Sequence, residues 1–292
     1  PKGIRPKELT ASLEAAPVIV TPVLRDMLGV GPEDVYLSPA PLYHAAPLGI
    51  NFAIPIAAGV TVILMDKWDA EDTLRLIETH EATHTHLVPT MMHRMLQLPE
   101  VTRNKYDVSS MRWIIHGAAP CPAHVKKAMM DWFGPIIYEY YSSTEGGGVF
   151  VGPHDWLKKP GTVGKAVPGV EIKLVPADGK TEIRFRGPNV MPGYWREPEL
   201  TAEAFDEEGF YRTGDAVRWV DPADPNRGLA FDGRIAEDFK LATGTFVSVG
   251  PMRARIAAAG APYVQDAVIT GHDRAEACAL IFLSAQAREL SD

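Results

Sequence analysis

The spacing of apolar residues predicts alternating strands and helices over the first 160 residues. The segment WDAEDTLRLIETH, residues 68–80, repeats apolar residues at helical spacing after Asp69, a suitable N-cap. The short apolar runs THTHLVP, MRWIIHG and PIIYEYY predict strands, and PTMMHRMLQLP and CPAHVKKAMMDWFG predict the helices between them. Strands that alternate with helices in this way predict an α/β fold with a parallel sheet flanked by helices.

The pattern changes after residue 160. From Gly161 to Asp221 the chain shows short alternating runs such as VEIKLVP and TEIRFRG, separated by Gly and Pro, which predict a small antiparallel β subdomain. From Gly233 a polar segment is followed by AVITG and ACALIFL, which suit the start of a small α+β C-terminal domain. We therefore expect three parts: 1–160, the α/β part of a large domain; 161–232, the β-rich subdomain; 233–292, a hinge and a truncated C-terminal domain.

One apolar segment raises the question of a membrane span. Residues 48–65 run for eighteen positions without a charge, close to the minimum for a spanning helix. Asn51, Pro55 and Gly59 interrupt this segment. We interpret it as a buried helix that ends around Pro55, a glycine turn, and a buried strand, VTVILM, so no membrane span is predicted.

Composition narrows the function classes. The 292 residues carry a formal net charge of -8 and no cluster of Lys and Arg, which argues against a nucleic-acid partner. Apolar residues make up 46% of the chain, enough for a sizeable core. Cys121 and Cys278 are too few and too far apart for a disulfide framework, which favours a cytoplasmic location.

The stretch YEYYSSTEGGG, residues 138–148, combines aromatic faces, hydroxyls, a carboxylate and glycines just after a predicted strand. Ligands of open parallel sheets bind beyond the carboxyl ends of the strands. A nucleotide would use Tyr141 as a flat surface, Thr144 for phosphate and Glu145 for Mg²⁺, with glycines that let the backbone approach the ligand. On composition alone, a Ser/Gly turn capped by Glu145, with the tyrosines in the core, explains the stretch equally well.

Other segments fit the same ligand. Asp215 follows a Thr-Gly turn, and one carboxylate can accept hydrogen bonds from both hydroxyls of a ribose. Arg234 offers a fixed fork of donors for a phosphate or sugar oxygen. The loop HGAAP, residues 116–120, follows another predicted strand and is small enough for a purine to lie against it. Each residue alone is typical of a solvated turn, but together they favour a nucleotide site.

The ordered set PLYHAAPLG, GAAPCP, YEYYSSTE, PGYWREPELT, GFYRTGD and DGRIAEDFKLATG resembles the motifs of the adenylate-forming superfamily, which includes acyl-CoA synthetases, nonribosomal adenylation domains and luciferases. The resemblance covers nearly all of the chain. It implies an acid–thiol ligase: a carboxylic acid attacks the α-phosphate of Mg·ATP to give an acyl adenylate and pyrophosphate, and the thiol of CoA then displaces AMP. ATP/AMP, Mg²⁺ and CoA are the implied cofactors.

The resemblance also implies residue roles. It places Tyr141 on adenine, Thr144 on phosphate, Asp215 on the ribose, and Asp238 at the hinge. The implied catalytic positions are Thr144, Glu145 and His44, and Glu145 is also the implied Mg²⁺ ligand. The implied nucleotide-binding positions are Gly117, Ala118, Ala119, Pro120, Tyr141, Ser143, Asp215 and Arg234.

The ends of the chain depart from the family pattern. Pro1, Lys2 and Gly3 resemble the tail of the family's phosphate loop, and the catalytic lysine late in the C-terminal domain has no counterpart. The chain is therefore interpreted as an internal fragment of an acyl-CoA synthetase. The alternative is a catalytically silent nucleotide-binding fragment.

The acid is less well defined. The segment from PLYHAAPLG to YYSSTE is similar to fatty-acyl-CoA synthetases, whereas residues 221–256 are similar to feruloyl-CoA synthetases. A hydrophobic acid, such as a fatty acid or a hydroxycinnamate, is expected. His84, His86 and His93 are interpreted as ordinary strand and helix histidines rather than zinc ligands, and Asp206 as a surface turn residue with no part in binding.

Overall fold

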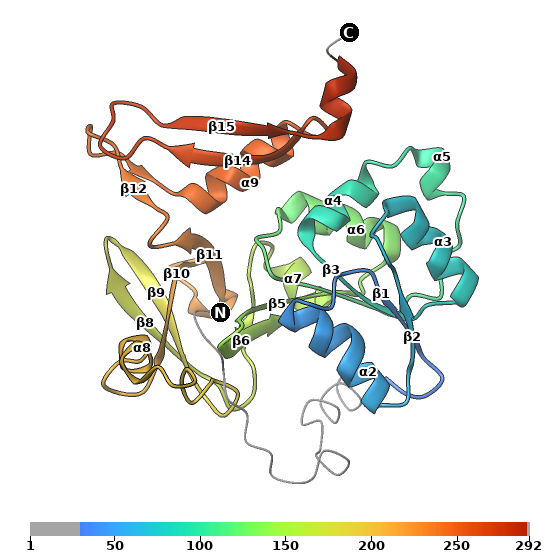
Figure 1. Cartoon of the computed structure of the whole chain (residues 1–292), viewed down its shortest axis with the longest axis horizontal. Coiled ribbons are helices and arrows are strands. Elements are labelled where there is room, and N and C mark those ends of the chain that lie inside the picture. The colour runs from blue at the N-terminus through green and yellow to red at the C-terminus, as the bar shows by residue number, and fades with distance from the viewer. Residues whose placement is uncertain (1–29, 291–292) are drawn as a thin grey trace.

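The computed structural model describes residues 30–290, whose largest sheet has seven strands in the order β2-β1-β3-β4-β5-β6-β7. The pairs among β1 to β5 are parallel, and β6 and β7 join in antiparallel register (Figure 1). The bounds are β1 (Val35–Ser38), β2 (Thr61–Leu64), β3 (His84–Leu87), β4 (Trp113–His116), β5 (Ile137–Ser143), β6 (Gly146–Val151) and β7 (Lys165–Ala166). The predicted α/β class is confirmed.

Helices cover both faces of this sheet. Leu74, Met92 and Met129, from three helices, pack with strand residues in one core on the first face, whereas Tyr36 and Trp113 belong to a second core on the face that η1 and α2 cover (Figure 1). The helices of the first face are α3 (Ala70–His80), α4 (Pro89–Leu96), α5 (Glu100–Arg103), α6 (Ala123–Phe133) and α7 (Pro153–Lys158), and those of the second are η1 (Pro47–Ala53) and α2 (Ile54–Ala57).

The segment 48–65 differs from its interpretation in two ways. The helix does not end at Pro55, because α2 follows η1 directly and runs through this proline to Ala57. The strand is not buried, because β2 is the edge strand, with Thr61 and Leu64 exposed. Among residues 30–290, no helix is long and apolar enough to cross a membrane.

A second, antiparallel sheet has the order β11-β10-β9-β8, with bounds β8 (Glu171–Ala177), β9 (Lys180–Arg186), β10 (Tyr211–Trp219) and β11 (Leu229–Arg234). Asp178 and Gly179 join β8 to β9 with positive φ angles of 47° and 79°, as a tight two-residue hairpin turn requires. Phe185 packs in one core with Val149 of β6, so the two sheets share apolar residues. Helices α8 (Pro198–Ala204) and η2 (Pro225–Arg227) lie in its connections.

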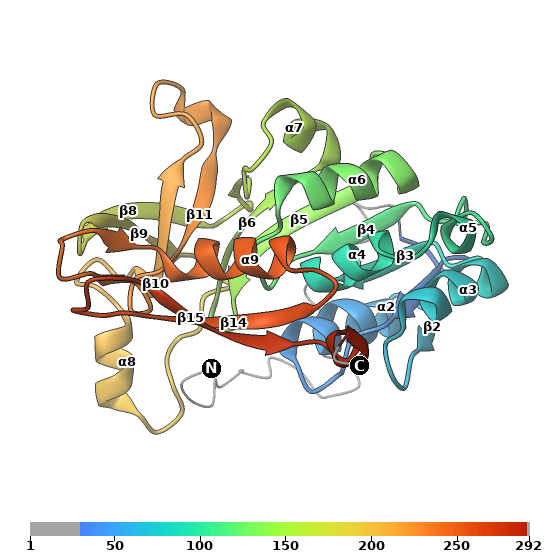
Figure 2. The ribbon, with the colours of Figure 1, turned by 90° about the horizontal axis from the view of Figure 1, so that it is seen from above.

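The last part of the chain, residues 239–290, is here called the C-terminal unit. It contains β12 (Phe239–Lys240), β13 (Phe246–Val247), α9 (Val249–Ala259), β14 (Val264–Thr270), β15 (Cys278–Leu283) and η3 (Ala285–Leu290). Val247, Ala267 and Ile269 form its own small core. Helix α9 contacts both β14 and β11, which brings the unit next to the second sheet (Figure 2). The three-part division, with bounds at 160 and 232, stays a prediction.

Candidate functional site

Asp215 lies on β10 where the strand register shifts against both of its neighbours. Its Oδ2 accepts a hydrogen bond of 2.7 Å from the Tyr141 hydroxyl. Its Oδ1 is buried and has no hydrogen-bond partner among residues 30–290, although Nε of Arg234 lies 3.5 Å away. A buried acceptor without a donor is costly, so Oδ1 is suited to a hydroxyl brought by a ligand.

Burial sets the protonation chemistry of this pair. It raises the pKa of Asp215, against the lowering effects of the Tyr141 hydrogen bond and Arg234. It also raises the pKa of Tyr141 well above its ordinary value, and the neighbouring Asp215 charge adds to this effect. Tyr141 therefore keeps its proton at neutral pH and acts as the donor. Its ring packs against Phe185 and Phe231, with centroid distances of 6.1 Å and 5.7 Å.

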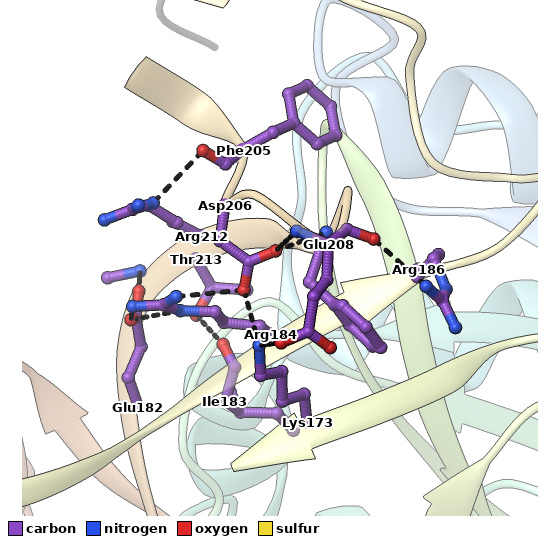
Figure 3. Close-up of polar contacts among 12 residues, drawn as sticks. Lys173, Glu182, Ile183, Arg184, Arg186, Phe205, Asp206, Glu208, Arg212 and Thr213 are labelled. Atoms are coloured by element: carbon purple, nitrogen blue, oxygen red, sulfur yellow. Dashed lines mark hydrogen bonds and ion pairs between the residues drawn. The ribbon is translucent and has the colours of Figure 1, made fainter. Parts of the chain in front are cut away.

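The turn before Asp215 is held by hydrogen bonds to β9 (Figure 3). Thr213 Oγ1 donates to the Ile183 carbonyl at 2.6 Å and accepts the Asp215 N–H at 3.0 Å. The N–H of Gly214 donates to Glu182 at 3.0 Å. These bonds fix the backbone on both sides of the turn, which fixes the direction of the Asp215 side chain.

The same network extends to Asp206, whose side chain is buried, so its interpretation as a surface turn residue is wrong. Only 7% of its side chain is exposed, and it accepts a bond of 3.1 Å each from Lys173 and Arg184 (Figure 3). Arg184 in turn pairs with Glu182 at 2.7 Å. Burial raises the pKa of Asp206. Hydrogen bonds from the N–H groups of Phe210 and Glu208, together with those from the two cations, outweigh this effect. The pKa of Asp206 is therefore well below its ordinary value.

We expect Asp206→Asn to lower the free energy of unfolding at pH 7 by about 1.5 to 3 kcal/mol, because it weakens hydrogen bonds to two charged partners. The depressed folded-state pKa means that this stabilisation is complete above the unfolded pKa of about 3.9 and is lost as pH falls below it. Urea unfolding checks both points, with Glu208→Gln as control, since Glu208 binds the same Lys173 but is 65% exposed. A deficit of equal size above and below pH 4 would contradict the ionic account.

The glycines of YEYYSSTEGGG serve protein packing, and their close approach to a ligand stays a prediction. Strand β5 runs through Ser143, and β6 begins at Gly146, so the stretch is a tight antiparallel hairpin. A Cβ on Gly146 would lie 2.1 Å from the carbonyl oxygen of Asn189, and one on Gly147 would lie 2.4 Å from the Phe185 ring. The glycines thus let the second sheet and its loops pack directly on the hairpin.

Glu145 lies buried in the turn of this hairpin. Its Oε1 accepts a bond of 2.9 Å from the Tyr194 hydroxyl, and its carbonyl oxygen accepts the Met191 N–H at 2.7 Å. Thr144 precedes it, half-buried, and Ser143 Oγ donates to the Gly146 carbonyl at 3.0 Å. Tyr194 was missed as a site residue, because nothing in the PGYW stretch indicates a partner 49 positions away.

The loop 117–120 lies beside the same strand end. Ala118, Ala119 and Pro120 are exposed, and Ala118 has a φ of 67°, a conformation that residues other than glycine rarely adopt outside functional sites and turns. A Cβ on Gly117 would lie 2.6 Å from the Tyr140 ring, so glycine is needed for the loop to rest on β5. The loop therefore lies beside the backbone and the ring of Tyr140, the residue before Tyr141 in β5.

His44 and Asp238 place no side chain in this group, although the Asp238 N–H donates to the Arg234 carbonyl at 3.3 Å. His44 is exposed at the start of η1, where its carbonyl accepts the Leu48 N–H at 3.0 Å and its ring contacts Tyr43. Asp238 is fully buried and contacts Lys180 and the N–H of Val249. The structure thus brings together Tyr141, Asp215 and Arg234, and the roles of all these residues stay predictions. Pro1 to Gly3 lie outside the described residues.

The three histidines have protein partners. His84 Nδ1 lies 2.7 Å from Thr83 Oγ1, and His93 Nε2 lies 3.1 Å from Gln97. His86 contacts Asn51 and Tyr140 through its two ring nitrogens, at 3.1 Å and 3.2 Å. In the described part of the chain, no group of three or more His, Cys, Asp or Glu residues is placed to hold a metal ion.

Comparisons with known proteins show which family this chain resembles. A family model described as AMP-binding enzyme matches residues 9–195. A 4-coumarate–CoA ligase of Pinus taeda is 33% identical over 203 residues, 65% of this chain and 37% of that protein. An indoleacetate–CoA ligase of Aromatoleum aromaticum is 32% identical over 212 residues, 67% of this chain and 41% of that protein. The chain thus spans about two fifths of the length of these relatives.

Solved structures show the same fold. The ATP-bound MatB from Rhodopseudomonas palustris superimposes with a TM-score of 0.71 at 28% identity, over 90% of this chain and 52% of that one. An AMP complex of the o-succinylbenzoate CoA synthetase MenE from Bacillus subtilis gives a TM-score of 0.72 at 24% identity, over 91% of this chain and 54% of that one.

Proposed function

The chain belongs to the AMP-binding enzyme family, and on this basis we propose that the protein containing it is an ATP-dependent acyl-CoA synthetase. The observation that carries the proposal is Asp215, whose Oδ1 lacks a donor while Oδ2 is held by Tyr141. The two hydroxyls of a ribose would supply the missing donors. Arg234, 67% exposed and 3.5 Å from Oδ1, would lie beside the sugar and its phosphate.

Glu145 and Thr144 are proposed for the phosphate side. Mg²⁺ in nucleotide sites commonly takes one or two protein carboxylates together with phosphate oxygens and waters. Glu145 fits this need, because Tyr194 occupies Oε1 and holds the carboxylate in place, with Oε2 as the candidate ligand atom. When bound, Mg²⁺ would neutralise phosphoryl charge. The chain's own contribution is to bind and orient the nucleotide, since a carboxylic acid is already ionised at neutral pH and needs no general base.

The acid proposed is hydrophobic, a fatty acid or a hydroxycinnamate, with CoA as the acceptor. Of the two, the aromatic acid is favoured by the relatives, because the pine and Aromatoleum proteins are named for 4-coumarate and indoleacetate. Cys121 and Cys278 are free thiols, which is in keeping with a cytoplasmic location.

Binding and exchange assays test the proposal together. We expect the 292-residue chain to bind AMP in calorimetry, because the acceptor pair at Asp215 is already assembled. We expect the protein that contains it to exchange pyrophosphate into ATP only when a hydrophobic acid is added, more with 4-coumarate than with a fatty acid. AMP binding without exchange for any acid would favour the silent nucleotide-binding alternative. No AMP binding by the folded chain would overturn both.

A further inference from the structure

A buried ion pair lies beside the ends of the loop 117–120. Lys126, near the start of α6, has a fully buried side chain, and its ammonium donates a hydrogen bond of 2.7 Å to Oε2 of Glu139 on β5. The Glu139 side chain is only 10% exposed. Burial raises the pKa of Glu139 and lowers the pKa of Lys126, and each charge opposes this effect on the other. Burying two ions is costly, yet no step of the proposed function uses either of them.

The carboxylate of Glu139 connects both ends of the loop to one strand. His116 is the last residue of β4 and directly precedes the loop, and its Nε2 lies 3.5 Å from Glu139 Oε2. Burial lowers the pKa of His116 well below its ordinary value, so this ring stays neutral and Lys126 supplies the balancing charge. Beyond the loop, the Pro122 carbonyl accepts the Lys126 N–H at 3.2 Å. One oxygen of Glu139 is thus close to the residue before the loop and to the helix after it.

The conformation of the loop needs such support. Ala118, Ala119 and Pro120 are exposed, and Ala118 has a φ of 67°. A residue other than glycine keeps this conformation only where the surrounding structure holds it. The contacts at Glu139 hold the chain on both sides of the exposed residues, so they fix where the loop starts and where it ends.

We propose that Lys126 and Glu139 are positioning residues that keep the loop 117–120 in the shape that receives the base of a nucleotide. The inference rests on the proposed function and on the predicted place of this loop beside adenine. A loop that is already ordered loses less conformational freedom when a ligand binds, so the pair should strengthen binding without touching the ligand. The ribose is proposed to bind Asp215, which lies outside the loop, so sugar binding should not depend on the pair.

Titrations with two ligands test this role. Lys126→Met/Glu139→Met replaces both ions by apolar side chains of similar length, so no buried charge is left unpaired. We expect this variant of the 292-residue chain to bind AMP about fivefold or more weakly than the wild-type chain. Ribose 5-phosphate lacks the base, and its affinity, measured by competition with AMP, should agree within about twofold between the two chains. Lys126→Met/Glu139→Gln, which keeps a polar side chain on β5, is a second version that should show the same pattern.

An ion pair at the other end of the same sheet provides the matched control. Asp34 precedes β1, is 5% exposed, and pairs at 3.0 Å with Arg112, which precedes β4. Asp34→Asn/Arg112→Met therefore also removes a buried carboxylate and its cation, but far from the loop, and should leave the affinity for AMP unchanged.

The outcomes separate the positioning role from the proposed function. Unchanged AMP affinity in either folded variant of the Lys126–Glu139 pair would overturn the role. Equal losses for AMP and ribose 5-phosphate, or an equal loss of AMP affinity in the control, would also overturn it, because the pair would then only stabilise the sheet. Failure of the wild-type chain itself to bind AMP would overturn the proposed function, and this inference with it.

Discussion

Asp215→Ala is expected to weaken AMP binding by at least tenfold, about 1.4 kcal/mol. A hydrogen bond from a ribose hydroxyl to a carboxylate is charge-assisted and contributes roughly 1.5 to 3 kcal/mol. Oδ1 accepts no hydrogen bond from residues 30–290, so the ligand hydroxyl replaces no existing bond there. Calorimetric titration of the wild-type and variant chains measures the difference.

The analogue and the controls locate the effect at the sugar. 2′,3′-Dideoxy-AMP lacks the hydroxyls, so Asp215→Ala should hardly change its affinity. Tyr141→Phe removes the donor to Oδ2 but keeps the carboxylate. Asp155→Ala removes an exposed carboxylate of α7. Neither variant should weaken AMP binding tenfold. Asp206→Ala is unsuitable as a control, because Asp206 supports the Thr213-Asp215 turn through Arg184 and Glu182. Equal losses for AMP and the dideoxy analogue would refute the ribose role.

Hydrophobic periodicity predicts most of the first sheet, because its strands are short apolar runs that alternate with capped helices. The Asp69 cap is an example: its side chain accepts the Asp72 N–H at 2.9 Å, as the sequence indicates. Periodicity does not reveal the place of a strand in the sheet. The strand VTVILM has a buried composition, yet β2 pairs only with β1, and its exposure follows from that edge position.

The site depends on contacts that cross large sequence separations. Tyr141 and Asp215 lie 74 positions apart, and the sequence linked them only through a shared ligand, not through a contact with each other. The hydrogen bond between them, the support from Glu182, and the bond from Tyr194 to Glu145 follow from how the second sheet packs on the hairpin. The packing role of the glycines at 146 and 147 could not be predicted for the same reason, since their close neighbours come from residues 185–190.

A further expected result concerns acid stability and His86. Burial lowers the pKa of His86 to about 4, from an ordinary value near 6.5. Between these two values the unfolded chain binds more protons at this position than the native one, so the free energy of unfolding falls as pH falls. One such histidine contributes about 1.4 kcal/mol per pH unit, or about 3 kcal/mol over the whole window. Burial, opposed by Asp34, also lowers the pKa of His84 to about 4, which steepens the dependence.

His86→Gln isolates one histidine's share of this dependence. The amide can hydrogen-bond with Asn51 and Tyr140, the partners of both ring nitrogens, but it does not take up a proton in this range. Urea unfolding at several pH values between 7 and 4.5 should therefore give a slope shallower by about 1.4 kcal/mol per pH unit in the middle of the window. His154→Gln, which alters an exposed ring on α7, should leave the slope unchanged. Parallel pH profiles for the wild-type chain and His86→Gln would show that His86 is charged or solvated in the folded protein, contrary to its burial on β3.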